Sequence, residues 1–249
     1  MQQSVPPLAW LKPSAPFPSL DMAWPADSDA PGLLAAGGAL DVPTLLEAYR
    51  NAVFPWFGEG QPILWWSPDP RMVLKTSDFR VHRSMRKTLV QFTQNPSAGI
   101  RMNTAFARVI ESCAQSKRKD QFGTWIMPRM VDAYTQLHAA GYAHSVETWI
   151  NGELVGGLYC VNIGMALFGE SMFAHQTNAS KIALAALVAW AGANGIEMID
   201  CQQNTNHLTS LGASEIPRSV FAGHVSVATN QPGPSWTFNP LYWDTILQR

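Results

Sequence analysis

Proline is distributed unevenly along this chain of 249 residues, and its distribution limits where long helices and strands can form. Twelve of the 18 prolines lie in the first 70 residues, together with five of the ten tryptophans. Proline lacks a backbone N–H and interrupts regular elements, whereas tryptophan supplies a large contact area. We therefore expect a small, loop-rich N-terminal domain over residues 1–69 and a more regular domain over residues 70–249.

The N-terminal part contains one clear helical pattern, from Val42 to Asn51. Asp41 is a good N-cap residue, and Pro43 suits the first turn. Two apolar runs follow at residues 54–57 and 63–68, and both are interrupted by glycine or proline. We expect these runs either to pack the two domains together or to form the wall of a binding site.

Residues after about 70 show a regular alternation of helical and strand patterns. Asn151-Gly152 is a strong hairpin signal, and Asn178 or Ser180 is expected to cap an apolar helix that ends near Ala193. The expected order is helices at 103–116 and 128–140, strands at 142–150, 153–161 and 165–173, the apolar helix, and a strand at 196–201. This order predicts an α+β fold with a mixed sheet of the N-acetyltransferase (GNAT) type.

The net charge of −1 conceals a strong asymmetry along the chain. Residues 71–129 carry twelve basic and three acidic side chains, so this segment is +9 and the remainder is −10. Clustered Arg and Lys residues are typical of proteins that bind nucleic acid, although a basic run is also compatible with a solvated surface.

Cysteine content and hydropathy exclude several other classes of protein. The three cysteines, Cys113, Cys160 and Cys201, are an odd number at wide spacing, which indicates neither a disulfide framework nor a zinc motif. The longest apolar stretch, residues 182–195, is too short to cross a bilayer, and the N-terminus lacks the pattern of a signal peptide. We expect a cytoplasmic protein that does not bind membranes.

Five ordered sequence blocks are specific enough to suggest a family. They are Phe54-Pro55-Trp56-Phe57, Leu64-Trp65-Trp66-Ser67-Pro68-Asp69-Pro70-Arg71, Gly123-Thr124-Trp125-Ile126, Gly169-Glu170-Ser171-Met172-Phe173 with Asn178-Ala179-Ser180-Lys181, and Ile199-Asp200-Cys201-Gln202 with Ser210-Leu211-Gly212-Ala213. Together they resemble the bacterial leucyl/phenylalanyl-tRNA-protein transferases from about Gly32 to Arg218.

The resemblance implies an enzyme that transfers Leu or Phe, and less readily Met, from aminoacyl-tRNA to proteins that begin with Arg or Lys, which marks them for N-degron degradation. It implies no metal and no coenzyme, and we expect a monomer. The partners are then an anionic tRNA and a cationic acceptor. The basic segment suits the tRNA backbone, and Arg80, Arg83, Arg86 and Lys87 lie close enough in sequence to form one patch.

The donor must bind in an apolar pocket, because Leu, Phe and Met differ from rejected residues in shape and in branching at Cβ. The resemblance implies that Leu167 and Leu187 line this pocket. It also implies that Trp56 and Trp125 flank the adenosine end of the donor, where an indole face can stack on a base. Packing in the core is the alternative role for both tryptophans.

Glu170 and Asp200 are carboxylates beside strands that otherwise bury their neighbours, so we expect them to be paired or functional. One hypothesis is an anionic pocket for the basic acceptor, and the other is an internal ion pair, for example with Lys181. Asp200 and Gln202 are the candidate catalytic residues. The Gln202 carbonyl would accept the amine proton while its NH2 group donates to Asp200, and the ribose 2′-hydroxyl is an alternative proton shuttle.

Three rival functions remain open at this point. A coenzyme-A-dependent acyltransferase would need a glycine-rich loop before the apolar helix, and residues 175–180 lack it. A cysteine amidohydrolase would use Cys201 with His207, although alternation along the strand predicts that Cys201 faces away from Asp200 and Gln202. A non-catalytic tRNA-binding module would need only the basic segment.

Overall fold

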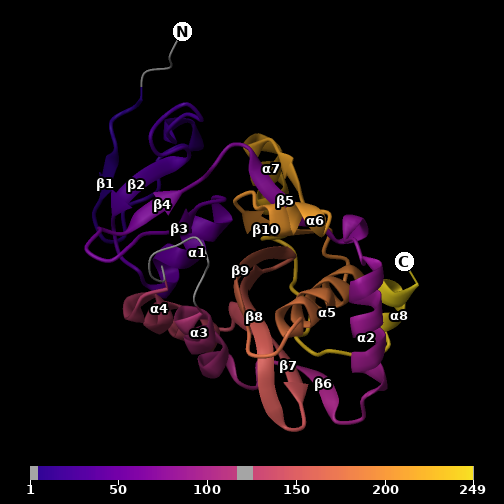
Figure 1. Ribbon diagram of the computed structural model, residues 1–249. Coiled ribbons are helices and arrows are strands. Elements are labelled where there is room, and N and C mark those ends of the chain that lie inside the picture. Colours follow the sequence, from indigo (N-terminus) through magenta and orange to yellow (C-terminus); the bar gives the residue numbers. More distant parts are fainter. Residues whose placement is uncertain (1–4, 117–125, 249) are drawn as a thin grey trace.

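The computed structural model describes residues 5–116 and 126–248, which form two sheets and the helices around them (Figure 1). The small sheet has the order β1-β2-β4-β3 and the large sheet the order β11-β5-β10-β9-β8-β7-β6. The strands of the small sheet are β1 (Ala9–Leu11), β2 (Leu33–Gly37), β3 (Phe54–Pro55) and β4 (Leu64–Trp66). Those of the large sheet are β5 (Arg71–Lys75), β6 (Ala98–Met102), β7 (Ala143–Ile150), β8 (Glu153–Ile163), β9 (Ala166–Ala174), β10 (Met198–Gln202) and β11 (Ser214–Ile216).

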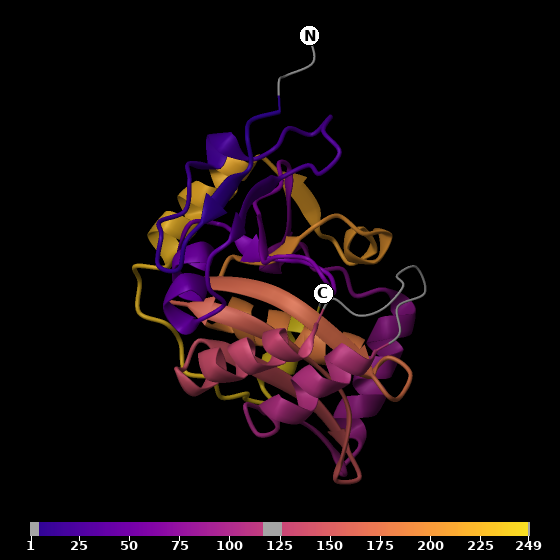
Figure 2. The same ribbon diagram turned by 90° about the vertical axis from the view of Figure 1, so that its left-hand side faces the viewer.

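Helices cover both faces of the large sheet, and Figure 2 shows α3 and α4 against one of them. On the opposite face, α5 packs on β7 and β8, and α8 packs on α5. The helices are α1 (Val42–Arg50), α2 (Arg83–Gln94), α3 (Phe106–Gln115), α4 (Pro128–Ala139), α5 (Ala179–Ala193), α6 (Asn206–Ser210), α7 (Arg218–Ala228) and α8 (Tyr242–Leu247). Short 3-10 turns lie at Leu20–Met22 and Thr76–Asp78.

The predicted α+β class and mixed sheet are confirmed. Strands β7, β8 and β9 form the expected antiparallel meander, and β10 returns beside β9 in parallel after the crossover through α5. Asn151 and Gly152 form the expected hairpin turn with φ values of 52° and 78°. Asp41 caps α1 by accepting a hydrogen bond from the Thr44 N–H at 2.9 Å.

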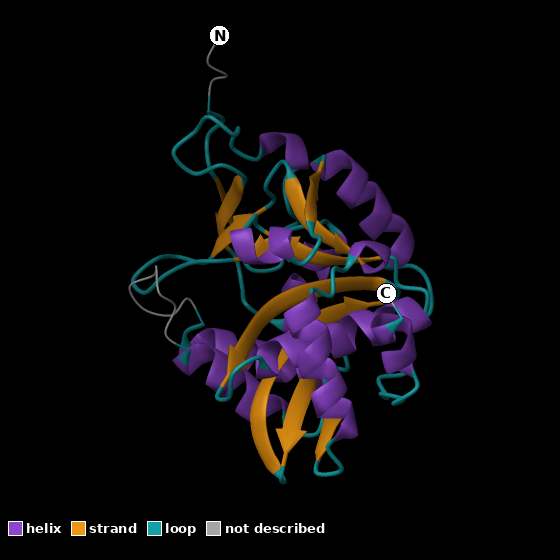
Figure 3. Cartoon of the chain, turned by 45° about the vertical axis from the view of Figure 1, so that its right-hand side comes forward, coloured by secondary structure: helices purple, strands orange, loops and turns teal. Residues whose placement is uncertain are grey.

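Two local features go beyond the expectations. The N-terminal region contains the four short strands of the small sheet besides its helix, each of two to five residues (Figure 3). Asn178 occupies the N-cap position of α5, as one expectation had it, but its side chain makes no capping hydrogen bond. Asn178 stands before the helix in the left-handed conformation, with φ of 67°, and its side chain donates to Thr88 Oγ1 at 3.4 Å.

One continuous core joins the two sheets. Tyr49 and Phe54 from the N-terminal region belong to the same buried cluster as Tyr134 and Phe168 from the large-sheet region. All strands of the small sheet precede residue 70 and all strands of the large sheet follow it. The division into two domains at residues 69 and 70 stays a prediction.

The C-terminal segment packs against the large sheet, as its tryptophans suggest. The Trp236 ring stacks on His144 with centroids 4.0 Å apart, and its Nε1 donates to Asn162 Oδ1 at 3.1 Å. The Trp190 ring lies 4.1 Å from Trp236. These contacts attach the segment before α8 to β7, β8 and α5.

Glu147 is a fully buried carboxylate on β7 that holds the start of α3. Its Oε1 accepts hydrogen bonds from the Thr104 and Ala105 N–H groups at 2.8 and 2.7 Å and from Ser145 Oγ at 2.8 Å. Its Oε2 accepts from Trp149 Nε1 at 3.0 Å and from Thr104 Oγ1. The carboxylate therefore replaces the side-chain cap that α3 lacks, at the positive end of the helix dipole.

We predict that Glu147→Gln lowers the free energy of unfolding by about 3 kcal/mol, because the new NH2 group would face donors that a carboxylate oxygen now satisfies. Urea unfolding followed by circular dichroism measures this loss. Glu153→Gln, at an exposed position on β8, is the matched control and should be neutral. Equal midpoints for the two variants would contradict this role of Glu147.

Candidate active site

The site forms where two neighbouring strands of the large sheet separate. Strands β9 and β10 pair only through Leu167 with Ile199 and Phe168 with Asp200. Just beyond, the register of β9 against β8 shifts so that Glu170 is an extra residue, and the register of β10 against β5 shifts at Cys201. Such bulges bend a strand and redirect its side chains. Two bulges side by side therefore open a gap in the sheet.

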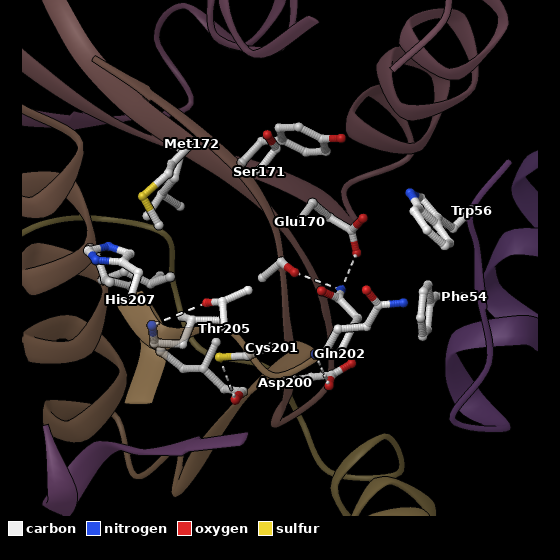
Figure 4. A pocket seen from close by; sticks show the side chains of 18 of the residues that line it. Phe54, Trp56, Glu170, Ser171, Met172, Asp200, Cys201, Gln202, Thr205 and His207 are labelled. Carbon is white, nitrogen blue, oxygen red and sulfur yellow. Dashed lines mark hydrogen bonds between the residues drawn. The ribbon is translucent and has the colours of Figure 1, made fainter. Parts of the chain in front are cut away.

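A cavity of about 480 Å³ lies at this gap, within the range of small-molecule sites (Figure 4). Its apolar lining comes mainly from β8, β9, α5 and the segment around β3, and its polar lining comes from the two bulges and the segment leading into α6. The apolar residues include Phe54, Trp56, Leu158, Met172, Leu184, Leu187, Ile199 and Leu208. The polar residues are Glu170, Ser171, Asp200, Cys201, Gln202, Gln203, Thr205 and His207.

Asp200 is neutralised by Arg71 on the neighbouring strand β5. Arg71 Nε donates to Asp200 Oδ1 at 2.7 Å and Nη2 to Oδ2 at 2.6 Å, and both side chains are fully buried. Arg71 Nη1 also donates to the Ala52 carbonyl at 3.2 Å, and the guanidinium lies between the rings of Phe54 and Phe221. The bidentate geometry and the flanking rings make this a rigid, dry ion pair.

This pairing corrects one expectation. The internal ion pair exists, but its partner is Arg71 and not Lys181. Asp200 is 1% exposed, and both of its oxygens already accept strong hydrogen bonds. The expected direct contact between Asp200 and a cationic acceptor stays a prediction.

Gln202 bridges the separated strands with its side chain. Its Nε2 donates to the Gly169 carbonyl at 2.7 Å and to Glu170 Oε1 at 3.3 Å. A carbonyl can only accept, so the NH2 group must face Gly169, and Oε1 is left to act as the acceptor. Asp200 instead accepts from the Gln202 backbone N–H at 2.9 Å. The expected side-chain bond from Gln202 to Asp200 is therefore wrong, because Gln202 has φ of 58° and no longer alternates with Asp200.

Glu170 lies between two buried tyrosines from the opposite side of the cavity. Tyr49 on α1 donates to Glu170 Oε1 at 2.7 Å, and Tyr134 on α4 donates to Oε2 at 3.3 Å. The two hydroxyl oxygens are 2.5 Å apart. Burial raises the pKa of Glu170 to about 8, the hydrogen bond from Tyr49 opposes this, and the charge of Asp200 adds to it.

Cys201 and His207 both line the cavity, and Cys201 also packs against the buried cluster that contains Leu74 and Ile199. Its position follows from the bulge, which breaks the alternation along β10. Burial and the charge of Asp200 nevertheless raise the Cys201 pKa well above its ordinary value, and its Sγ contacts the Ile199 carbonyl at 3.7 Å. A thiol held protonated is a poor nucleophile.

Of the two leucines expected in the donor pocket, Leu187 on α5 lines the cavity and Leu167 does not. Leu167 lies before the bulge of β9, where regular pairing with Ile199 and Asn162 keeps it in the core. Trp56 lines the cavity and packs edge-on against Trp66, with centroids 5.5 Å apart. Trp125, the other expected tryptophan, lies outside the described residues.

Three of the four expected tRNA-binding residues are exposed. Arg80, Arg83 and Lys87 face solvent, whereas Arg86 is half-buried and donates to the Leu247 carbonyl. The Arg80 backbone N–H donates to the Leu211 carbonyl at 2.9 Å, directly after α6. The start of α2 therefore lies near α6, which contributes His207 and Leu208 to the cavity lining (Figure 1).

The described residues of the basic segment do not form one patch, and Lys117, Arg118 and Lys119 lie outside them. Arg71 is buried in its ion pair, and Arg101 and Arg108 both lie over the ring of Trp149, at 4.3 and 5.4 Å, on the part of the sheet that carries β6 and β7. Arg129 lies over Phe57. The charge of a sequence segment does not say which faces its residues occupy.

Sequence reasoning missed three residues that hold the site together. Arg71 is part of the quoted block ending in Pro70-Arg71, but its charge was counted with the surface. Tyr49 and Tyr134 lie on the apolar faces of two helices, where a tyrosine ordinarily packs its ring. A buried phenol needs a hydrogen-bond partner, and this requirement was the available signal.

Among the described residues, no group of three or more His, Cys, Asp or Glu side chains is placed to hold a metal ion. In the same part of the chain, no helix combines the length and the hydropathy that a bilayer crossing requires.

Family comparison gives a consistent result over most of the chain. Residues 73–226 match the family model of leucyl/phenylalanyl-tRNA protein transferase, and residues 38–69 match that of its N-terminal domain. A leucyl/phenylalanyl-tRNA–protein transferase from Polaromonas sp. is 59% identical over 241 residues, covering 97% of this chain and 94% of that protein. The enzyme of that name from Albidiferax ferrireducens is 54% identical, covering 99% and 97%.

Solved structures give more distant matches. A GCN5-related N-acetyltransferase-like protein from Streptococcus suis has a TM-score of 0.33 and 14% identity, covering 70% of this chain and 63% of that one. L-PGS from Bacillus licheniformis has a TM-score of 0.38 and 12% identity, covering 72% and 63%.

The raised pKa of Glu170 predicts a dependence of stability on pH. The folded-state pKa of about 8 lies above the ordinary value of 4.5, so the stabilising contribution is complete below about pH 4.5 and is lost as the pH rises through 8. Glu170→Gln should therefore gain stability relative to the wild type by about 1.4 kcal/mol per pH unit over this window. Urea unfolding at pH 5 to 9 measures the difference.

Glu111→Gln, at an exposed position on α3, is the control and should show no such trend. A constant difference between Glu170→Gln and the wild type across this range would contradict a protonated Glu170 at neutral pH.

Proposed function

Because this chain belongs to the leucyl/phenylalanyl-tRNA protein transferase family, we propose that it transfers Leu or Phe, and less readily Met, from aminoacyl-tRNA to proteins whose first residue is Arg or Lys. It is an aminoacyltransferase. The modified proteins would enter the N-degron degradation route in the bacterial cytoplasm. The observation that carries the proposal is the cavity between the bulges of β9 and β10. Met172 lies toward one end of it, called here the apolar end, and Glu170 and Gln202 lie toward the other, called here the polar end (Figure 4).

The apolar end suits the donor side chain. Met172, Leu184 and Leu187 line it, and their flexible or γ-branched side chains can surround a Leu, Phe or Met side chain. A hydrophobic pocket separates side chains that differ by one methylene by only about 1 to 3 kcal/mol, so rejection of Val and Ile needs steric contact near Cβ. The adenosine at the end of the tRNA would stack on Trp56, and Trp125 is proposed as its second platform.

The polar end suits the acceptor. Glu170 is the cavity carboxylate available to the positive charge of a basic N-terminus, since Arg71 already neutralises Asp200. A cation close to Glu170 would lower the pKa of that carboxyl and favour its ionised form. Asp200 then acts in acceptor binding only indirectly, by fixing the backbone of Gln202.

The main requirement for catalysis is that the enzyme holds the amine and the ester in contact. The ester of an aminoacyl-tRNA is already activated, so the proposed step needs neither a coenzyme nor a metal. Alignment of the two groups is worth roughly 7 to 11 kcal/mol in favourable cases. Gln202 would orient the attacking amine through Oε1, because Gly169 and Glu170 hold its NH2 group.

The two enzyme rivals are less well supported. The turn before α5 has Asn178 in the left-handed conformation and lacks the glycines that a pyrophosphate loop uses. Cys201 has a strongly raised pKa, which disfavours the thiolate that an amidohydrolase needs.

A transfer assay tests the proposal directly. Leu-tRNA and Phe-tRNA should donate to an Arg-initiated peptide, and Val-tRNA should react at least about tenfold more slowly, because Cβ branching clashes with the donor pocket. An Ala-initiated peptide should accept little from any donor. Single-turnover transfer of radiolabelled amino acid measures both preferences. Equal transfer to both peptides would contradict the acceptor role of Glu170, and no transfer at all would refute the proposed activity.

The exposed basic residues on α2 are proposed to bind the tRNA backbone. Arg83→Ala with Lys87→Ala should weaken aminoacyl-tRNA binding and reduce the slope of log K against log salt by roughly 1 to 2, because each lost phosphate contact removes about 0.7 to 0.9 from the slope. Filter binding across a salt series measures it.

The matched control removes the same number of charges elsewhere, with Arg101→Ala and Arg108→Ala, whose guanidinium groups lie over Trp149. This double variant should keep the wild-type slope. The same slope for both double variants would place the tRNA on another surface.

A further inference from the structure

Glu170, Tyr49 and Tyr134 form a closed cluster of oxygen atoms that comes from three elements, β9, α1 and α4. Tyr49 Oη is 2.7 Å from Glu170 Oε1 and 2.5 Å from Tyr134 Oη, and Tyr134 Oη is 3.3 Å from Glu170 Oε2. Both phenols are fully buried, whereas Glu170 is partly exposed at the cavity. The cluster therefore joins the cavity to the protein interior.

The hydrogen atoms of this cluster can be arranged in two ways without moving its oxygen atoms. When Glu170 is ionised, Tyr49 donates to its Oε1, and Tyr134, which lies within reach of both acceptors, donates to Oε2 or to Tyr49 Oη. When Glu170 is protonated, its O–H donates to Tyr49 Oη and Tyr49 donates to Tyr134 Oη. A hydroxyl is both donor and acceptor and rotates freely, so the gain or loss of one proton at Glu170, with one rotation at each tyrosine, interconverts the two states.

The groups that face Glu170 from the surrounding elements do not compete for this proton. Asp200 on β10 is ion-paired with Arg71 on β5. Burial and the charge of Glu170 itself keep the Cys160 thiol on β8 protonated, with its pKa raised well above the ordinary value. Burial and the charge of Glu170 likewise raise the pKa of Tyr49 and of Tyr134. The amide of Gln202, at 3.3 Å, does not titrate.

We propose that Glu170 takes the proton that the acceptor's α-ammonium must lose before it attacks the aminoacyl ester, and that Tyr49 and Tyr134 position Glu170 for this transfer. This inference rests on the proposed function and deepens it. It changes the role of Glu170 from a fixed negative charge that binds the acceptor to a group that exchanges a proton with it.

The proposed step moves two protons and replaces a C–O bond with an N–C bond. The ammonium nitrogen gives one proton to the Glu170 carboxylate and becomes a neutral amine. Its lone pair forms the N–C bond to the ester carbonyl carbon, and the C–O bond to the ribose breaks. The nitrogen's second proton passes to the leaving ribose oxygen, directly or through the neighbouring 2′-hydroxyl. Glu170 later releases its proton to solvent, so one proton appears per peptide bond formed.

The chemistry of the neighbouring groups favours Glu170 for this role. The carbonyl of Gln202 accepts a hydrogen bond but is far too weak a base to hold a proton, and the Asp200 carboxylate is stabilised as an anion by two bonds from Arg71. Glu170 lies beside the Gln202 amide, where the amine would be oriented. The raised pKa of Glu170, about 8, is close to that of an α-amine, which suits exchange at neutral pH.

The test is the pH dependence of the single-turnover transfer rate with saturating Leu-tRNA and an Arg-initiated peptide. Tyr49→Phe removes a bond that favours the carboxylate, so the acid limb of the profile should move to higher pH by about one unit. Tyr134→Phe should move it less. Glu170→Gln should lower the neutral-pH rate at least about a hundredfold. Tyr242→Phe on α8 is the matched control and should keep the wild-type profile.

A chemical rescue separates proton transfer from positioning. An acceptor whose α-amine is replaced by a weakly basic aminooxy group is already neutral at pH 7, so the defect of Glu170→Gln should shrink about tenfold or more with it. An unmoved acid limb in Tyr49→Phe, with the rate lowered equally at every pH, would overturn the proposal, as would a defect of Glu170→Gln that is equally large with both acceptors.

The proposed function and this inference fail in different ways. If the wild type transfers Leu to the peptide but the variant profiles are unmoved, only the role of the cluster is refuted. If the wild type transfers nothing, the proposed function itself fails. Melting curves of each variant, expected to show one cooperative transition above the assay temperature, and aminoacyl-tRNA binding, expected to match the wild type, show that a lower rate does not come from unfolding or from loss of the donor.

Discussion

The buried ion pair between Arg71 and Asp200 connects the parts of the protein that must stay in register for a site to exist. It links β5 to β10 by two short hydrogen bonds, and Arg71 reaches the Ala52 carbonyl in the N-terminal region. Removing one partner of such a pair leaves an uncompensated charge and typically costs about 3 to 5 kcal/mol. Because Asp200 also accepts from the Gln202 N–H, the same pair sets the backbone from which Gln202 reaches Gly169. The ion pair thus has a structural role, because it fixes the backbone that lines the cavity.

The cavity itself depends on interrupted strand pairing. Parallel strands β9 and β10 share only two residue pairs before Glu170 and Cys201 become extra residues, and the side chain of Gln202 then donates across the gap to a strand carbonyl. This arrangement opens the sheet without leaving the Gly169 carbonyl unpaired, which would be costly in a partly buried position. It also places a neutral amide, a carboxyl group and two phenols within one hydrogen-bonded network, where a proton can change place without large movements of atoms.

Much of the fold was predictable because local signals agreed with one another. The Asp41 cap, the Asn151-Gly152 turn and the strand alternation over residues 142–173 each act within a few residues, and the structure confirms all three. The family resemblance also pointed to Glu170, Asp200, Gln202, Trp56 and Leu187 as site residues, and all five line the cavity. The errors concern long-range partners. Asp200 pairs with a residue 129 positions away, and Leu167 stays in the core because the bulge begins after it.

The sequence by itself determined the family, the α+β order of elements and the residue types at the site, because these follow from short-range patterns and from ordered motifs. The tertiary structure alone decided which charges are available for chemistry. The twelve basic residues of segment 71–129 do not reveal which way each side chain points. Folding buries Arg71, places Arg101 and Arg108 over Trp149, and leaves Arg83 and Lys87 in solvent. Folding also pairs Asp200 with Arg71, whereas burial raises the pKa of Glu170. The physical reason is that solvation and pairing act through space, between residues that the chain brings together only when it folds.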